Sequence, residues 1–182
     1  QENRIALTPL STSLLVLNGH EVIIESGAGV AANFSDKDYS DQGAKIVYDK
    51  KQVYQADLII KIAPPTADEI QMMKAGQVLF SALQMSTLKT EYLHTLMKKK
   101  ITALSFEYLR DEGNTLSVVR AMSEIVGATS VLIAAEYLSN VFEGKGLMLG
   151  GITGVPPTEV VILGAGTVGE YAARTAIALG AE

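Results

Sequence analysis

The residues with the clearest chemical meaning are three glycines near the end of the printed sequence. Gly164, Gly166 and Gly169 form a Gly-x-Gly-x-x-Gly pattern between an apolar run, residues 158–163, and an alanine-rich stretch, residues 170–179. Between a strand and a helix, this pattern predicts a dinucleotide-binding turn. We expect the first glycine to allow the tight turn, the second to let the backbone approach a pyrophosphate, and the third to let the helix pack closely on the strand. The helix N-terminus would then offer free N–H groups to the phosphates.

The whole turn is the predicted cofactor site, and its six residues are Gly164, Ala165, Gly166, Thr167, Val168 and Gly169. The local pattern alone leaves open a glycine-rich turn that binds no nucleotide. The acidic residue that contacts the ribose lies about 20 residues after such a turn. The sequence stops before that point, so it does not indicate a preference between NAD and NADP.

The elements ahead of this turn alternate between short β-rich runs and amphipathic helical runs. Five strands are predicted, at residues 21–25, 45–48, 57–62, 78–82 and 101–106. The third run is almost continuously apolar, as in a strand of a parallel sheet that is buried on both faces. Helix starts are predicted at Thr8, Ser35 and Thr66, the last two as capping boxes. The alternation predicts an α/β fold with an open, doubly wound parallel sheet, and we expect a sixth strand before residue 1.

A turn cluster at residues 111–114 predicts the boundary between two domains, residues 1–114 and residues 115–182. The second part should begin with a connecting helix at about 117–140. This stretch is apolar over much of its surface, which is typical of a helix that is buried or shared between domains. Residues 158–179 would then form the first βα unit of an incomplete Rossmann domain, with a further strand expected after it.

Composition excludes several classes of function. The net charge of −5 argues against a nucleic-acid partner, which needs a basic face. The sequence has no cysteine and two histidines, His20 and His94, so we expect neither thiol chemistry nor a metal site. No uninterrupted apolar run reaches the roughly 18 residues of a membrane helix, and no signal peptide is visible. We therefore expect a cytoplasmic globular protein.

Three segments together resemble the family of alanine dehydrogenases and proton-translocating transhydrogenase α subunits. They are residues 2–9 followed by 19–22 and 25–29, residues 122–127, and residues 149–157, which lead into the glycine pattern. The resemblance is closer to alanine dehydrogenase, because residues 116–121 do not match the Arg-Ala-Gln-rich stretch of the transhydrogenase subunits. It implies an enzyme that oxidises L-alanine to pyruvate and ammonia with NAD. It also implies a cleft between two domains for the amino acid or 2-oxo acid, and a homo-oligomer, usually a hexamer.

The resemblance also implies roles for single residues. Arg4 matches the arginine that grips the substrate carboxylate, a task that suits the guanidinium fork. Residues 61–65 match the family's Lys-Val-Lys-Glu-Pro, so that Ala63 replaces the lysine that contacts substrate. Gln84 replaces the catalytic histidine, and glutamine cannot shuttle a proton. We name Arg4, Lys61 and Gln84 as candidate catalytic residues, because the Lys61 side chain could reach the cleft in place of Ala63.

Several alternatives stay open. Arg4 could be a solvated charge, and Lys61 a structural lysine at a strand end. Glu107 is a further candidate because ligands gather at strand C-terminal ends, although an ordinary loop charge is the alternative. The replaced lysine and histidine favour a transhydrogenase α-like domain, which binds NAD(H) and passes hydride to a partner subunit. A dinucleotide-binding regulator without turnover is the third hypothesis.

Overall fold

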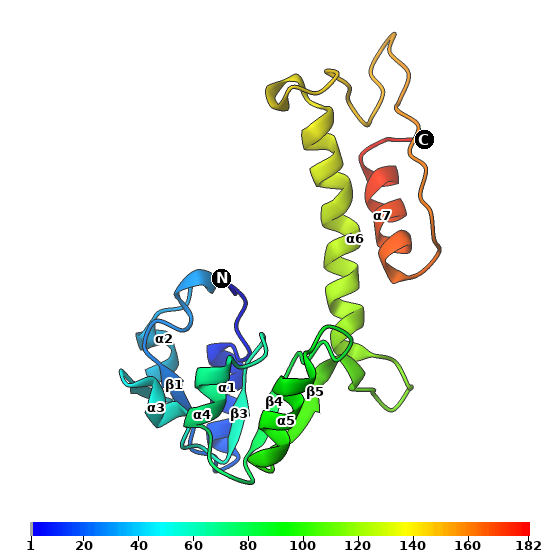
Figure 1. The fold of residues 1–182 in the computed structure, drawn as a ribbon. Coiled ribbons are helices and arrows are strands. Elements are labelled where there is room, and N and C mark those ends of the chain that lie inside the picture. The colour runs from blue at the N-terminus through cyan, green and yellow to red at the C-terminus, as the bar shows by residue number, and fades with distance from the viewer. Residues whose placement is uncertain (1) are drawn as a thin grey trace. The chain divides into compact units, whose positions relative to one another are not determined.

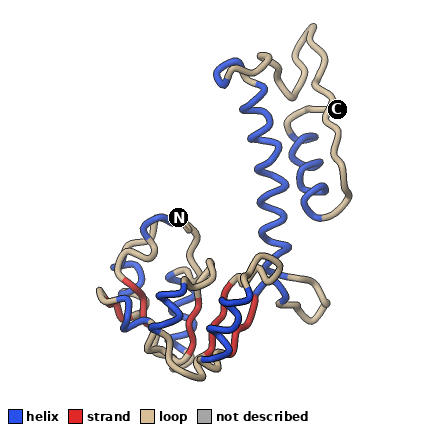
Figure 2. The backbone as a smooth tube through the Cα atoms, viewed as in Figure 1, coloured by secondary structure: helices blue, strands red, loops and turns tan. Residues whose placement is uncertain are grey.

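The structure is a computed structural model that describes residues 2–182. The chain divides into two compact units, one ending at Tyr108 and the other comprising Leu109–Glu182 (Figure 1). All the strands of the described residues belong to the first unit (Figure 2).

The first unit alternates strands and helices, as predicted. Its strands are β1 (Ile23–Glu25), β2 (Lys45–Val47), β3 (Leu58–Ile60), β4 (Val78–Ser81) and β5 (Thr102–Ser105). Its helices are α1 (Pro9–Leu17), α2 (Asp36–Ser40), α3 (Lys50–Val53), α4 (Ala67–Met72) and α5 (Thr90–Lys98), with 3₁₀ turns η1 (Val30–Ala32) and η2 (Phe106–Tyr108). All strand pairs are parallel. The α/β class and the parallel pairing are confirmed.

The sheet differs from the prediction in one respect. It consists of two separate parts, β1-β2 and β3-β4-β5, in place of one open sheet. The physical reason is that β1 and β3 each have a hydrogen-bonded strand on one side only, and they do not pair with each other. The apolar run of β3 is consequently not buried on both faces, since Ile59 is 4% exposed but Leu58 is 45% exposed.

The helix starts follow the predicted capping chemistry. Thr8 accepts a hydrogen bond from the Ser11 backbone and caps α1. Ser35 caps α2 and Thr66 caps α4, each in a complete capping box with the acidic residue three positions later. These caps satisfy N–H groups that the helix itself leaves free, so they fix where each helix begins.

Two hydrophobic clusters stabilise the first unit. The larger surrounds Ile70 and Leu79, which are both fully buried between α4, α5 and the β3-β4-β5 sheet. The smaller surrounds Tyr39, whose hydroxyl donates a hydrogen bond of 2.8 Å to the Leu7 carbonyl and so ties α2 to the segment before α1.

The second unit consists of α6 (Ser117–Leu138), η3 (Asn140–Phe142) and α7 (Thr167–Ala178). The helices α6 and α7 lie side by side (Figure 1). Val131 of α6 packs with Leu149, Ala172 and Ala176 in the core of this unit. The helices predicted at about 117–140 and at 170–179 thus agree with α6 and α7 within three residues at each end.

The predicted strand at residues 158–163 is extended backbone that forms no named strand. The reason is that a strand requires a run of hydrogen-bonded neighbours, and the described residues supply only two: Leu149, whose carbonyl accepts from the Thr158 N–H at 3.0 Å, and Glu182. Val160 N–H donates to the Glu182 carbonyl at 2.6 Å, and Glu182 N–H donates to the Thr158 carbonyl at 3.1 Å. These two bonds are the pattern of one rung of a parallel ladder.

Among the described helices, α6 is long and apolar enough to cross a membrane, judged by length and composition only. The helix carries Arg120, Glu124 and Glu136, and Gly127 and Val131 are buried within the unit. One helix of this kind is weak evidence for a membrane span, because helices in the core of soluble proteins pass the same test.

Replacing Gly127 by alanine should destabilise the second unit. An alanine Cβ would overlap the Val168 carbonyl oxygen and lie 2.8 Å from the Tyr171 Cβ. Overpacking of this kind costs about 1–3 kcal/mol, whereas alanine at an open helix site would stabilise by up to about 1 kcal/mol. Urea unfolding followed by circular dichroism measures the change, with Thr129→Ala on the exposed side of α6 as control. Equal stability of Gly127→Ala and the parent chain would show that the helices can move apart.

Candidate dinucleotide and carboxylate sites

The glycine turn of the second unit leads directly into α7. Gly164 has a φ of +115°, which only glycine adopts readily. A Cβ at Gly166 would meet nothing within 4 Å, so the backbone is open on that side. A Cβ at Gly169 would overlap the Gly164 carbonyl oxygen, and thus the first turn of α7 packs directly on the turn before it.

The N-terminus of α7 can accept an anion. Its N-cap is Gly166, and no side chain caps the helix. The first N–H groups of a helix have no partner within the helix, and the helix dipole adds a partial positive charge there. A cavity of about 510 Å³ lies against this end, and its lining includes five of the six predicted cofactor residues, all but Ala165. The chemistry of this end suits a phosphate group.

A second cavity, of about 720 Å³, lies within the first unit. Arg4 and Lys61 both line it, together with Glu69. The structure therefore brings two of the three candidate catalytic residues to one cavity. Gln84 and Glu107 do not line it.

The Arg4 guanidinium already holds a carboxylate. Its Nε and Nη2 each donate a hydrogen bond of 2.8 Å to Glu2, one to each carboxylate oxygen. The side-chain hydrogen bond from Arg4 lowers the pKa of Glu2 to about 2. The fork is therefore arranged for bidentate binding, and a carboxylate ligand would have to displace Glu2 to use it.

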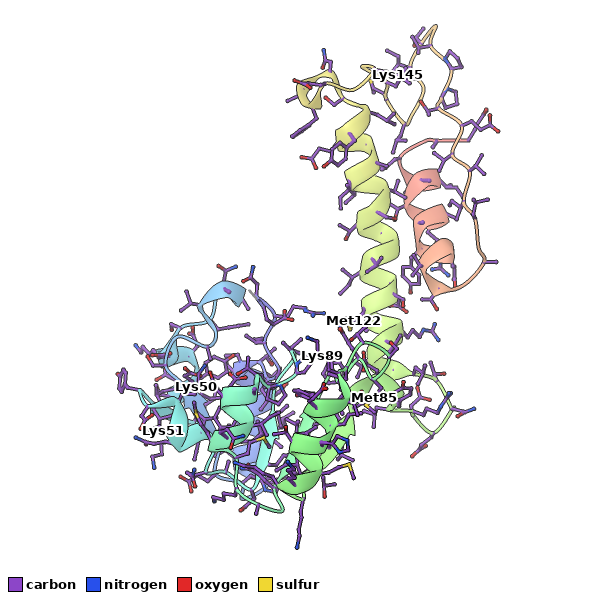
Figure 3. All side chains as sticks on the ribbon, viewed as in Figure 1. Lys50, Lys51, Met85, Lys89, Met122 and Lys145 are labelled. Carbon is purple, nitrogen blue, oxygen red and sulfur yellow. The ribbon has the colours of Figure 1, made fainter. Side chains whose placement is uncertain are left out.

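Lys61 is held by an acidic residue that the sequence suggested only as a helix cap. Its ammonium lies 2.7 Å from Glu69 Oε2. The ammonium of Lys50 in α3, a residue labelled in Figure 3, lies 3.3 Å from the other oxygen. The same Glu69 accepts the Thr66 backbone N–H of the capping box at 2.8 Å. Burial by itself would raise the pKa of Glu69, but hydrogen bonds from Lys61, Thr66 and Lys50 together lower it to about 2. Proximity in space to two lysines could not be read from the capping pattern.

Replacing Glu69 by glutamine should remove part of the acid sensitivity of the first unit. The ionised carboxylate stabilises the fold above its ordinary pKa of 4.5, and that stability is lost as the pH falls toward the folded value of about 2. The shift corresponds to at most about 3 kcal/mol. Urea midpoints between pH 2 and 7 measure the effect, with Glu91→Gln on the exposed face of α5 as control. If the urea midpoint of Glu69→Gln depends on pH as that of the parent chain does, the ion pairs of Glu69 with Lys61 and Lys50 contribute nothing to stability.

Gln84 lies in a loop that Glu107 organises. The backbone of Gln84 has a φ of +46°, in the left-handed region. Its N–H donates to Glu107 Oε2 at 2.9 Å, and the Ser105 hydroxyl donates to the same oxygen at 2.7 Å. Glu107 therefore connects the segment after β4 to the end of β5. Glu107 bonds the backbone N–H at position 84, so this contact does not depend on which side chain that position carries.

The described residues contain no group of three or more His, Asp or Glu side chains that could hold a metal ion. His20 lines the 720 Å³ cavity, and His94 lies on α5 outside both cavities. Neither has a hydrogen-bonded partner that would suggest a catalytic role among the described contacts.

The fold and these sites define an α/β protein with a glycine-rich turn at a helix N-terminus. The chain belongs to the alanine dehydrogenase/PNT family, because residues 1–126 match its N-terminal domain and residues 130–182 its C-terminal domain. It is 40% identical to the alanine dehydrogenase of Methanococcus maripaludis and 39% identical to that of Bacillus subtilis, in each case over 100% of this chain. It spans 48% and 47% of those proteins, respectively, and thus about half their length.

Solved structures agree with this assignment. An L-alanine dehydrogenase superposes with a TM-score of 0.94 at 38% identity, covering 100% of this chain and 50% of that one. The transhydrogenase from Sinorhizobium meliloti superposes with a TM-score of 0.85 at 26% identity, covering 99% of this chain and 53% of that one. The expected resemblance to both branches of the family is confirmed.

Proposed function

We propose that the full-length protein is an NAD-dependent oxidoreductase of the alanine dehydrogenase type, which oxidises L-alanine or a related amino acid to its 2-oxo acid. The observation that carries this proposal is the uncapped start of α7, where Gly166 leaves the backbone open and no side chain occupies the helix N-terminus. Such an end binds phosphate through backbone N–H groups. The identity to alanine dehydrogenases over the whole chain supports the choice of reaction.

The residues present fit the cofactor. The N–H groups of the turn from Gly164 to Gly169 would hold the pyrophosphate, and the open side of Gly166 would admit it. NAD, when bound, supplies the acceptor for a hydride from the substrate α-carbon. The chain's own contribution is to bind and orient the dinucleotide at this turn.

Substrate binding is proposed at Arg4, where the guanidinium fork would exchange Glu2 for the substrate carboxylate. Gln84 would donate a hydrogen bond to the reacting group but could not take up its proton. We propose a positioning role for Lys61, because its ammonium is bound to Glu69. Glu107 would position Gln84 through the backbone.

The second candidate function is NAD(H) binding for hydride transfer to a partner subunit. The likeness to a transhydrogenase and the absence of a lysine and a histidine at positions 63 and 84 favour it. A dinucleotide-binding regulator would retain the glycine turn and lack turnover altogether.

One set of assays on the full-length protein separates the three functions. NADH formation is measured with L-alanine and with other amino acids, and hydride transfer from NADH to a nicotinamide analogue is measured separately. We expect NADH formation, with a KM that rises at least tenfold in Arg4→Lys. NADH binding without amino-acid oxidation would overturn the leading proposal, and analogue reduction would then establish the second.

A cytoplasmic location, homo-oligomeric assembly and an amino-acid or 2-oxo-acid partner are further parts of this proposal. They come from the family resemblance, and sedimentation of the full-length protein would test the assembly.

A further inference from the structure

Arg4 binds the Glu2 carboxylate through three donors of two different kinds. Its Nε donates to Glu2 Oε1 and its Nη2 donates to Oε2, each at 2.8 Å. The backbone N–H of Arg4 also donates to Oε1, at 3.0 Å. This backbone bond does not involve the guanidinium. Glu2 can therefore release the guanidinium fork and still be held beside it.

The pair of Arg4 and Glu2 lies where a charged ligand can reach it. Arg4 lines the cavity of the first unit, and the side chains of Arg4 and Glu2 are 56% and 28% exposed. An exposed ion pair contributes little to stability, because water competes for both charges. Exchange of this pair for contacts with a ligand therefore costs the fold little.

The two charges of the pair are the complement of an α-amino acid. Arg4 offers a planar fork to a carboxylate, and Glu2 offers a carboxylate to an ammonium group. An α-amino acid carries its carboxylate and its ammonium group on the same carbon atom. Its carboxylate can take the fork while its ammonium group takes the oxygen that Glu2 releases. After this exchange every one of the four charges still has a partner.

A carboxylate without an ammonium group meets the same pair less favourably. It would bring a second negative charge to the single guanidinium and leave Glu2 without a cation. Like charges placed together, and charged groups left unpaired, are the means by which a site rejects close relatives of its ligand. Propionate, which is alanine without the amino group, is such a relative, and so is the 2-oxo acid.

We propose that Glu2 is a specificity-determining residue, which releases Arg4 to the substrate carboxylate, binds the substrate ammonium group, and so selects α-amino acids over other carboxylates. This inference rests on the proposed function, because it takes Arg4 as the carboxylate site. It also gives Glu2 a part in product release. The 2-oxo acid has lost the amino nitrogen and offers Glu2 no partner, so Glu2 can take the fork back.

The dissociation constants of L-alanine and propionate test this inference. Both are measured by calorimetric titration of the full-length protein with NADH present, which prevents oxidation of the alanine. We expect the parent protein to bind alanine more than tenfold more tightly than propionate. In Glu2→Gln this preference should fall at least tenfold, because alanine binds more weakly and propionate more tightly. Glu91→Gln, the same change at an exposed acid of α5, should keep the preference.

The other outcomes each contradict the inference in a recognisable way. Equal weakening of both ligands in Glu2→Gln would mean that Glu2 only holds Arg4 in place. Equal strengthening would mean that Glu2 only competes for the fork, and an unchanged preference would exclude contact with the ammonium group. Glu2→Gln should keep the melting temperature of the parent, because the pair is exposed.

Failure of the proposed function gives a different result. If the parent prefers alanine to propionate and Glu2→Gln removes that preference, but no amino acid yields NADH, the proposed reaction is wrong and the role of Glu2 in ligand selection stands. If the parent binds neither alanine nor propionate, Arg4 is not a carboxylate site and both proposals are wrong.

Discussion

Alanine at Gly169 should abolish NAD binding by the full-length protein, whereas alanine at Gly166 should weaken binding and leave the fold intact. A Cβ at position 169 would overlap the Gly164 carbonyl oxygen, which belongs to the backbone and cannot swing aside. A Cβ at position 166 would meet nothing, and the φ of −80° there suits alanine. The two variants therefore separate the packing role of a glycine from its role in admitting a ligand.

Calorimetric titration with NAD and thermal unfolding are measured for both variants. Gly169→Ala should lower the stability of the second unit by about 1–3 kcal/mol, the cost of overpacking. Gly166→Ala should keep its melting temperature and raise the dissociation constant at least tenfold, which corresponds to about 1.4 kcal/mol. Unaltered NAD affinity in Gly166→Ala would place the pyrophosphate elsewhere.

Introducing a lysine at position 63 and a histidine at position 84, the residues that the family resemblance implies there, should raise the rate of alanine oxidation by the full-length protein. A positioned general acid–base contributes about 10²–10⁴ fold, and neither Ala63 nor Gln84 can take up a proton. The loop should accept histidine, because Glu107 fixes the backbone at position 84 and histidine is among the residues enriched at positive φ. We expect the Ala63→Lys, Gln84→His double variant to show most of this increase in kcat/KM.

The pH profile distinguishes proton transfer from a change in packing. A histidine at position 84 should add a new pH-dependent change in kcat/KM, centred near its ordinary pKa of about 6.5. Gln84→Asn tolerates the same backbone and cannot shuttle a proton, so it should neither raise the rate nor add such a change to the profile. If the double variant is no faster than the parent, the present residues already supply the chemistry, or the protein does not oxidise alanine.

Local sequence signals predicted the elements of this fold well, because they depend on neighbours a few residues away. The capping boxes at Ser35 and Thr66 are complete, and Gly164 has the positive φ that a tight turn needs. The short helix α3 was not predicted, since four residues carry too little periodicity to be recognised.

Signals that depend on distant partners were harder to interpret. Residues 158–163 have the composition of a strand, but a strand requires a neighbouring strand, and the described residues supply only the rung at Glu182 and one bond from Thr158 to Leu149. The pairs of Arg4 with Glu2 and of Lys61 with Glu69 were not predicted either, since ion pairing depends on side-chain placement. The substrate roles of Arg4, Lys61 and Gln84 stay predictions until the proposed assays are made.

Glu69 illustrates how a site inferred from mutagenesis alone could be misassigned. Its carboxylate completes the capping box at the start of α4 and also pairs with Lys50 of α3 and with Lys61, which directly follows β3. A scan that scores only lost turnover would rank this position with the groups that touch substrate, although its own contacts are all structural. Surveys of this family should therefore pair each activity measurement with a folding measurement before an acid beside a lysine is named as a proton donor.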